Sequence, residues 1–184
     1  MNDLKTFWFH PQTPLYCQTM NEMSAALDEK LIANFINSYL PRKRKSIIDL
    51  GIGTGRELVW LDRVLWVNRI IGIDYSEEML KFCQNQAKKC NHEIKLINDD
   101  MLKPILLPKL VKTYKDPFIF LSLINTFGNF TKEERIIILK NLSSLSKKSD
   151  RVILALYKKS QHVKLLSTIE NSPYFQTKEP KDKA

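Results

Sequence analysis

Cysteine and histidine are scarce in this 184-residue chain, with three of each. The cysteines are an odd number without Cys-x-x-Cys spacing, which excludes a disulfide framework and a zinc knuckle and is typical of reduced thiols. The histidines are scattered and predict neither a metal-ligand cluster nor a Ser-His-Asp arrangement. These residues are Cys17, Cys83, Cys90, His10, His92 and His162. We therefore expect a protein without a bound metal.

Long apolar runs are also missing. No segment approaches the roughly 20 apolar residues that a helix needs to cross a bilayer. The N-terminus has no basic stretch followed by an apolar one, as a signal peptide would. These absences predict a cytoplasmic protein that does not enter the membrane. The length suits one domain and is short for two.

Acidic residues are outnumbered: 29 Lys and Arg face 20 Asp and Glu, a net charge of +9. A basic surplus favours RNA, because binding to phosphates releases condensed counterions. However, the cations are mostly lysine, 22 against 7 arginines, and they are spread along the chain. Only the Arg-Lys-Arg-Lys run at 42–45 is dense. The charge is compatible with a solvated basic surface and with an RNA-binding one.

Short β-branched runs alternate with helical patterns through the middle of the chain. We expect strands at 46–50, 69–73, 93–98, 117–123 and 151–157, and helices at 55–66, 76–90 and 131–147. Continuously apolar strands separated by helices predict an α/β fold: a doubly wound, mostly parallel sheet of about five strands with helices on both faces. This core would span 46–170. Residues 1–45 would form a lead-in and helix on the substrate side, and 171–184 a polar tail.

Glycine is rare too, yet three of the five glycines alternate in the turn after the first predicted strand. Gly51, Gly53 and Gly55 allow positive φ and let a ligand lie against the main chain. Asp74 ends the second predicted strand, where a carboxylate can accept bonds from both ribose hydroxyls. Together they predict a nucleoside site at the carboxyl ends of the strands.

The residue after Gly55 decides which nucleoside ligand is favoured. A dinucleotide site needs Gly-x-Gly-x-x-Gly, whose last glycine lets the helix pack closely under a pyrophosphate. In this chain that position is Arg56. A bulky side chain there argues against a dehydrogenase.

The segment DLGIGTG at 49–55 resembles the first motif of the class I S-adenosylmethionine-dependent methyltransferases. Three later segments are similar to further motifs of that family: 70–80 to the ribose-binding motif, 97–104 to the adenine-contacting motif, and 118–130 to the motif that faces the methyl group. The resemblance covers about residues 46–157. It implies a doubly wound sheet with the strand order 3-2-1-4-5, and S-adenosyl-L-methionine as the cofactor.

The resemblance also implies a set of cofactor contacts. They are Asp49, Gly51, Gly53, Gly55, Asp74, Tyr75, Met79, Asp100, Met101 and Leu123. In this set Asp100 would lie near the adenine amino group and the Met101 backbone near the ring. The alternative is that Asp100 or its neighbour Asp99 simply ends a strand in a turn, where Asp is favoured.

Methyl transfer from a sulfonium needs positioning more than a catalytic dyad. We expect Asn125 to orient the acceptor, which makes it the candidate catalytic residue. Asn129 is a substrate candidate because 125–130, NTFGNF, is similar to a segment of the histidine α-N-methyltransferases. Tyr16, from the lead-in, could close over the substrate. Asn125, Thr126 and Asn129 also suit turns and caps.

The acceptor is expected to be a small molecule with a nitrogen or oxygen nucleophile. Residues 124–127 lack the prolines of base-amino methyltransferases and the cysteine of cytosine C5 enzymes. The alternatives are an RNA or protein methyltransferase, and a cofactor-binding domain without turnover. The 27 residues after Tyr157 are too few for the usual further helix and C-terminal antiparallel strand pair. We therefore expect the fifth strand to be an edge, covered by a partner such as a second copy in a homodimer.

Overall fold

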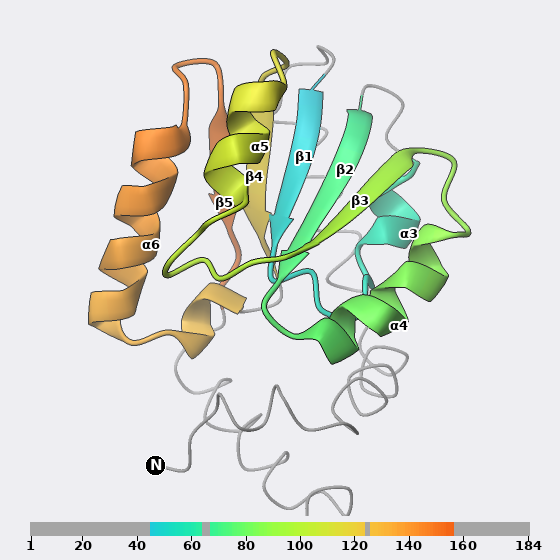
Figure 1. Ribbon diagram of the computed structural model, residues 1–184, viewed down its shortest axis with the longest axis horizontal. Coiled ribbons are helices and arrows are strands. Elements are labelled where there is room, and N and C mark those ends of the chain that lie inside the picture. Colours follow the sequence, from blue (N-terminus) through green and yellow to red (C-terminus); the bar gives the residue numbers. More distant parts are fainter. Residues whose placement is uncertain (1–44, 64–66, 124–125, 157–184) are drawn as a thin grey trace, which may run out of the picture.

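A computed structural model describes residues 45–63, 67–123 and 126–156 of the chain. These residues form five strands, four α-helices and one 3₁₀ helix (Figure 1). In chain order they are β1 (Lys45–Leu50), α3 (Leu58–Leu61), β2 (Val67–Asp74), α4 (Glu77–Ala87), β3 (Glu93–Asn98), α5 (Leu107–Thr113), β4 (Phe118–Ser122), η1 (Thr126–Asn129), α6 (Lys132–Leu145) and β5 (Arg151–Leu154).

The five strands form one parallel sheet in the order β3-β2-β1-β4-β5, as predicted. β1 lies at the centre, paired with β2 on one side and β4 on the other. Its register places Leu50 beside Ile73, and β2 in turn places Asp74 beside Asn98. The carboxyl ends of β1, β2 and β3 therefore meet at one edge of the sheet, at the bottom of Figure 1.

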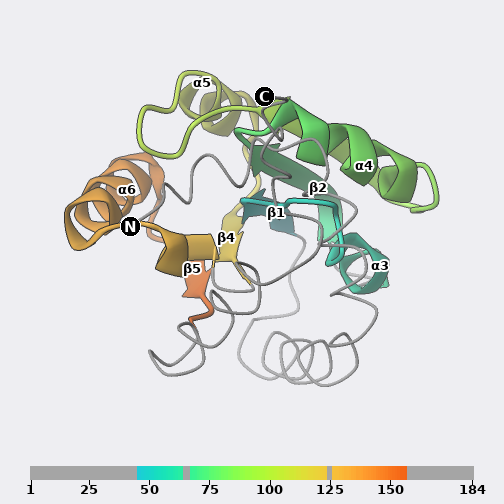
Figure 2. The same cartoon turned by 90° about the horizontal axis from the view of Figure 1, so that it is seen from below.

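Helices cover both faces of the sheet, also as predicted. Successive strand residues point to opposite faces, so Ile47 packs with α3 and α4, while Ile48 packs with α5 and α6. Phe118 and Phe120 lie on the α5–α6 face and have no exposed surface. Figure 2, viewed toward the carboxyl ends of the strands, separates α5 and α6 from α3 across the sheet. Two apolar layers enclose the buried strands.

Helix α5 was not predicted from the sequence. It has only seven residues and includes Pro108 in its first turn, so it lacks a full amphipathic repeat. Its N-terminal N–H groups are bound by a residue from outside the helix: Asp99 Oδ2 accepts from the N–H groups of Leu106 and Leu107, at 2.9 and 2.8 Å. Because this cap lies eight residues before Leu107, local capping signals do not show it.

Two expected elements are shorter than predicted. The helix expected at 55–66 begins only at Leu58, because the turn at Gly55 occupies the preceding residues, and α3 ends at Leu61. The fifth strand ends at Leu154 instead of 157. Within the described residues β5 pairs only with β4, and the homodimer at this edge stays a prediction. No helix among those residues is long and apolar enough to cross a membrane.

Several predictions lie outside the described residues. They are most of the lead-in at 1–45, the end of the core beyond residue 156, and the polar tail at 171–184.

Asp62 joins the end of α3 to the start of β3. Its carboxylate accepts hydrogen bonds from the N–H groups of Asn91 and His92, and from both of their side chains, at 2.8–3.0 Å. Burial alone would raise the pKa of Asp62, but these bonds outweigh it and lower the pKa to about 2. The ionised carboxylate thus stabilises the turn that leads into the edge strand β3.

We expect Asp62→Asn to lower the free energy of unfolding by about 2 kcal/mol at neutral pH. The stabilisation is present above pH 4 or so, where Asp62 is ionised in both states. It is lost as the pH falls toward the folded pKa of about 2. Urea denaturation of both proteins between pH 7 and pH 2.5 measures this. A stability gap that stays constant across that range would contradict the electrostatic explanation.

Candidate functional site

The glycine turn is tied to the end of β2. The N–H groups of Gly51 and Ile52 both donate to the Ile73 carbonyl, at 2.7 and 3.0 Å, and the N–H of Gly53 donates to Asp74 Oδ2 at 2.9 Å. These bonds close the turn over the carboxyl ends of the two strands. The main chain of the turn, without side chains, then forms one wall of the site.

Gly51 and Gly53 serve different purposes in this turn. Both have positive φ, at 77° and 56°. A Cβ on Gly51 would collide with the Thr126 side chain from η1, whereas a Cβ on Gly53 would meet nothing within 4 Å. Gly51 is therefore needed for packing. Gly53 leaves open space beside the main chain, where a ligand can approach.

Asp74 links the turn to helix α4. Its Oδ1 accepts from the N–H of Ser76 at 2.9 Å, and Ser76 in turn caps α4 by accepting from the N–H of Met79. Burial raises the pKa of Asp74, and the N–H donors of Ser76, Gly53 and Tyr75 oppose the shift. Asp74 as a whole residue is 8% exposed, and it lines the site. It can still accept from a ligand, since each oxygen has two lone pairs.

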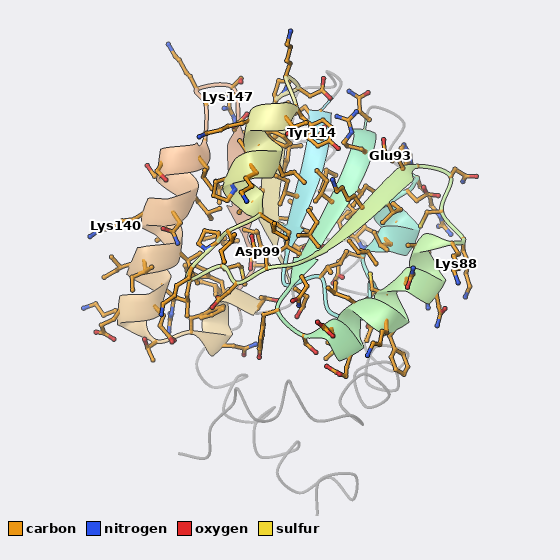
Figure 3. All side chains as sticks on the ribbon, viewed as in Figure 1. Lys88, Glu93, Asp99, Tyr114, Lys140 and Lys147 are labelled. Carbon is orange, nitrogen blue, oxygen red and sulfur yellow. The ribbon has the colours of Figure 1, made fainter. Side chains whose placement is uncertain are left out.

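The two aspartates after β3 have different roles. Asp99 is buried, and its two oxygens accept from the N–H groups of Asp100, Ile105, Leu106 and Leu107. Asp100 is exposed and uses Oδ1 to accept from the N–H of Leu102 at 2.8 Å. Asp99 therefore fixes the shape of the loop, and Figure 3 shows it below α5. Asp100 is the carboxylate presented to the site.

These elements enclose a cavity of about 150 Å³ that opens to solvent. Its walls come from the glycine turn, the end of β2, the loop after β3, and η1. The lining residues are Gly51, Gly53, Ile73, Asp74, Tyr75, Met79, Asp99, Asp100, Met101, Leu102, Thr126, Asn129 and Phe130. Among the described residues, no group of His, Cys, Asp or Glu is arranged to hold a metal ion.

A family model described as a methyltransferase domain matches residues 47–149, more than half of the chain. The chain belongs to this methyltransferase domain family. The match begins in β1 and ends just before β5, so it covers the glycine turn and every described wall of the cavity.

Similar proteins support this assignment. The chain is 29% identical over 86 residues to the protein-lysine N-methyltransferase EFM4 of Saccharomyces cerevisiae, covering 47% of this chain and 38% of that protein. It is 32% identical over 90 residues to the carboxy-S-adenosyl-L-methionine synthase of Nautilia profundicola, covering 49% and 34%. The chain matches little more than a third of the length of either relative.

A solved structure shows the same fold. An S-adenosylmethionine-dependent methyltransferase from Clostridium acetobutylicum superposes with a TM-score of 0.65 at 16% identity, over 82% of this chain and 60% of that one. The doubly wound architecture is therefore common to both proteins.

The methyltransferase domain brings most of the sequence-predicted residues together. Eight of them line the cavity: Gly51, Gly53, Asp74, Tyr75, Met79, Asp100, Met101 and Asn129. The structure adds Ile73, Asp99, Leu102, Thr126 and Phe130 to these. Thr126 and Phe130 flank Asn129 in the sequence, so the same motif could have revealed them. Asn125 and Tyr16 lie outside the described residues.

Three predicted residues do not line the cavity. Gly55 packs against Cys83, where an added Cβ would approach Sγ to 2.6 Å. The Leu123 side chain is buried in the core, and its carbonyl accepts from the N–H of Thr126 at 3.1 Å. Asp49 is buried under the turn. These residues support the wall of the site from behind.

Asp49 is a buried carboxyl group directly before the glycine turn of the methyltransferase domain. It is 1% exposed, and its Oδ2 has no hydrogen-bond partner among the described residues. Burial raises the pKa of Asp49 well above its ordinary value, and the nearby carboxylates of Glu57 and Asp74 raise it further. A cation close to the turn would relieve this cost.

We expect Gly51→Ala to lower mainly the thermal stability, and Gly53→Ala to lower mainly the affinity for the ligand. Gly51→Ala should lower the melting temperature by several degrees, because its methyl group collides with Thr126. Gly53→Ala should cost about 1–2 kcal/mol of backbone strain and should mainly weaken ligand binding, since its methyl group occupies cavity space. Thermal unfolding and ligand titration of both variants separate the effects. As a control, Thr126→Ala should restore part of the melting temperature lost in Gly51→Ala. If both glycine variants lost stability and ligand affinity to the same extent, the separate roles of Gly51 and Gly53 would be contradicted.

The raised pKa of Asp49 predicts a specific pH dependence. Between the unfolded and folded pKa values, the native state keeps the proton and the unfolded chain releases it, so the stability conferred by Asp49 falls as the pH rises. Asn cannot titrate, so Asp49→Asn should gain stability relative to wild type between pH 5 and pH 8. Urea denaturation at both values measures the gain. A stability difference that is independent of pH would show that Asp49 ionises normally.

Proposed function

We propose that this protein transfers a methyl group from S-adenosyl-L-methionine to a small molecule with a nitrogen or oxygen nucleophile. The observation that carries the proposal is the cavity at the carboxyl ends of β1, β2 and β3, enclosed by the glycine turn, Asp74 and the loop at 99–102. Ligands of parallel α/β sheets bind in this position.

The residues present fit the cofactor. The Asp74 carboxylate at the end of β2 suits two ribose hydroxyls, and the apolar lining from Met79, Met101 and Leu102 suits an adenine ring. The open space beside Gly53 lets a ligand approach the main chain, and the buried Asp49 below favours a positive charge. When bound, the cofactor supplies an electrophilic methyl group on a sulfonium.

The role of the protein in this reaction is to hold the acceptor in line with the methyl group. Asn129, Thr126 and Phe130 from η1 and its C-terminal end line the cavity and would contact the acceptor. Phe130 provides an apolar surface that helps to exclude water, and Asn129 provides an amide that can donate or accept. Asn125 remains the proposed orienting residue.

The charge of the cavity favours an amine over RNA. Its charged lining residues in the described part of the chain are three aspartates, Asp74, Asp99 and Asp100, with no Lys or Arg among them. Lys147 lies at the opposite end of the sheet, where its Nζ donates to the carbonyl of Tyr114 at 3.5 Å (Figure 3). An acidic lining attracts a protonated amine instead, which must lose one proton to solvent before its lone pair can accept the methyl group.

Protein methylation is the second candidate. A lysine ammonium suits the same acidic lining, and one relative is a protein-lysine N-methyltransferase by name. The two functions differ in how the acceptor reaches the methyl group, because a peptide must lie across the cavity mouth. Competition between free amines and a lysine peptide distinguishes them.

The direct test is production of S-adenosylhomocysteine from S-adenosylmethionine with a panel of acceptors. We expect product with a small amine or alcohol, and none with RNA alone. Asp74→Asn should weaken S-adenosylhomocysteine binding at least tenfold, because it replaces a charged acceptor of ribose hydroxyls. Glu77→Gln, which removes an exposed carboxylate from the first turn of α4, is the matched control and should bind normally.

Three results would overturn parts of this proposal. Turnover only with a lysine peptide would replace the small-molecule acceptor by a protein. Binding without turnover for any acceptor would leave a cofactor-binding domain. Stabilisation by NAD and not by S-adenosylhomocysteine would refute the cofactor itself.

A further inference from the structure

Asn141 reaches from the middle of α6 to the loop after β3. Its side-chain amide donates to two consecutive carbonyls, those of Met101 at 3.0 Å and Leu102 at 3.2 Å, across 40 and 39 residues of sequence. Asn141 itself does not line the cavity, whereas Met101 and Leu102 do. The outer helix thus holds part of the cavity wall.

An asparagine in this position needs an explanation. Asn is a weak helix former because its amide competes with the main chain for hydrogen bonds. α6 spans 14 residues, and Asn141 lies well inside it, close to the core residue Leu142. The two carbonyl contacts use both donor hydrogens of the amide, so the side chain performs a function that Asp or Leu cannot.

The loop that it holds is fixed from both sides. Asp99 binds four N–H groups of the loop and of the start of α5, and Asn141 binds two carbonyls. Asp99 thus satisfies the donors and Asn141 satisfies the acceptors. The carbonyls of Met101 and Leu102 are consequently turned toward α6, and the opposite side of the loop is presented to the cavity.

A second contact shows that α6 supports more than one wall. Arg135 Nε, one turn into α6, donates to the Phe130 carbonyl at 2.8 Å, just before the capping box of Thr131 and Glu134. Phe130 lines the cavity as well. α6 therefore holds the loop after β3 through Asn141, and the end of η1 through Arg135.

We propose that Asn141 is a positioning residue that sets the adenine affinity and selectivity of the cavity. The proposal rests on the proposed function, since it assumes that adenine packs against Met101 and Leu102. Asn141 acts through the main chain of these residues. It fixes the orientation of their peptide groups, and thereby the position of the loop atoms that would contact the adenine. Fixing this loop before binding reduces the ordering cost that binding would otherwise incur.

Asn141→Asp is the sharpest variant because it keeps the shape and removes both donors. Its carboxylate would also face two carbonyl oxygens, so the loop must shift. We expect about tenfold weaker binding of S-adenosylhomocysteine by calorimetry, the loss given by one to two hydrogen bonds. 5′-Methylthioadenosine, which lacks the amino-acid part, should weaken by the same factor.

A selectivity measurement separates positioning from general destabilisation. The ratio of affinities for S-adenosylhomocysteine and its hypoxanthine analogue, S-inosylhomocysteine, should fall in Asn141→Asp, because a misplaced loop reads the base less well. Asn141→Gln retains the amide and should recover part of the affinity and the ratio. Lys140→Ala, at the adjacent exposed position on the outer side of α6, should leave both unchanged (Figure 3).

Each outcome bears on a defined claim. If Asn141→Asp binds all three ligands like wild type, or weakens only the ligands with an amino-acid part, the inference is wrong while the proposed function stands. If wild type binds none of them, the proposed function fails and the inference fails with it. Should Asn141→Asp not fold, Asn141→Ser carries the same comparison, with the affinity ratio as the deciding quantity.

Discussion

The Asp74 carboxylate is the interaction on which the rest of the site depends. It accepts from the main chain of the glycine turn through Gly53 and from the start of α4 through Ser76. The Asp74 carbonyl accepts from the N–H of Asp99, so the same residue also fixes the start of the loop after β3. One residue at the end of β2 thereby sets the relative positions of three walls of the cavity.

The buried carboxyl groups around the glycine turn destabilise the fold, and this indicates that they have a role in binding. Asp49, Glu57 and Asp74 are all buried around the turn. Burial raises the pKa of Asp49, and the carboxylates of Glu57 and Asp74 raise it further. A structure selected only for stability would replace such groups by apolar ones. Buried acids under an open turn are reasonable where a cationic ligand binds, because the ligand offsets the repulsion.

Local sequence patterns were sufficient for the sheet and for the first half of the site. The β-branched runs located the strands, and the spacing from Gly51 to Asp74 gave two walls of the cavity, because both features depend on residues close in sequence. Helix α5 and the different roles of Asp99 and Asp100 were not predictable in this way. Each depends on contacts that form only in the folded chain, such as Asp99 with Leu107, or Asn141 with Met101.

The site residues behind the cavity illustrate the same limit. The resemblance implied cofactor contacts at Asp49, Gly55 and Leu123, and the structure buries all three residues. A motif records which residues a site needs, and it does not separate those that touch a ligand from those that hold the wall. Burial and hydrogen bonding, as for Leu123 and Thr126, make that distinction.

A crystal structure of the protein soaked with S-adenosylhomocysteine tests the central claim most directly. The account predicts both ribose hydroxyls within hydrogen-bond distance of the Asp74 carboxylate, and the adenine ring against Met101 and Leu102. Ligand density elsewhere on the molecule, or a ribose that does not contact Asp74, would contradict it.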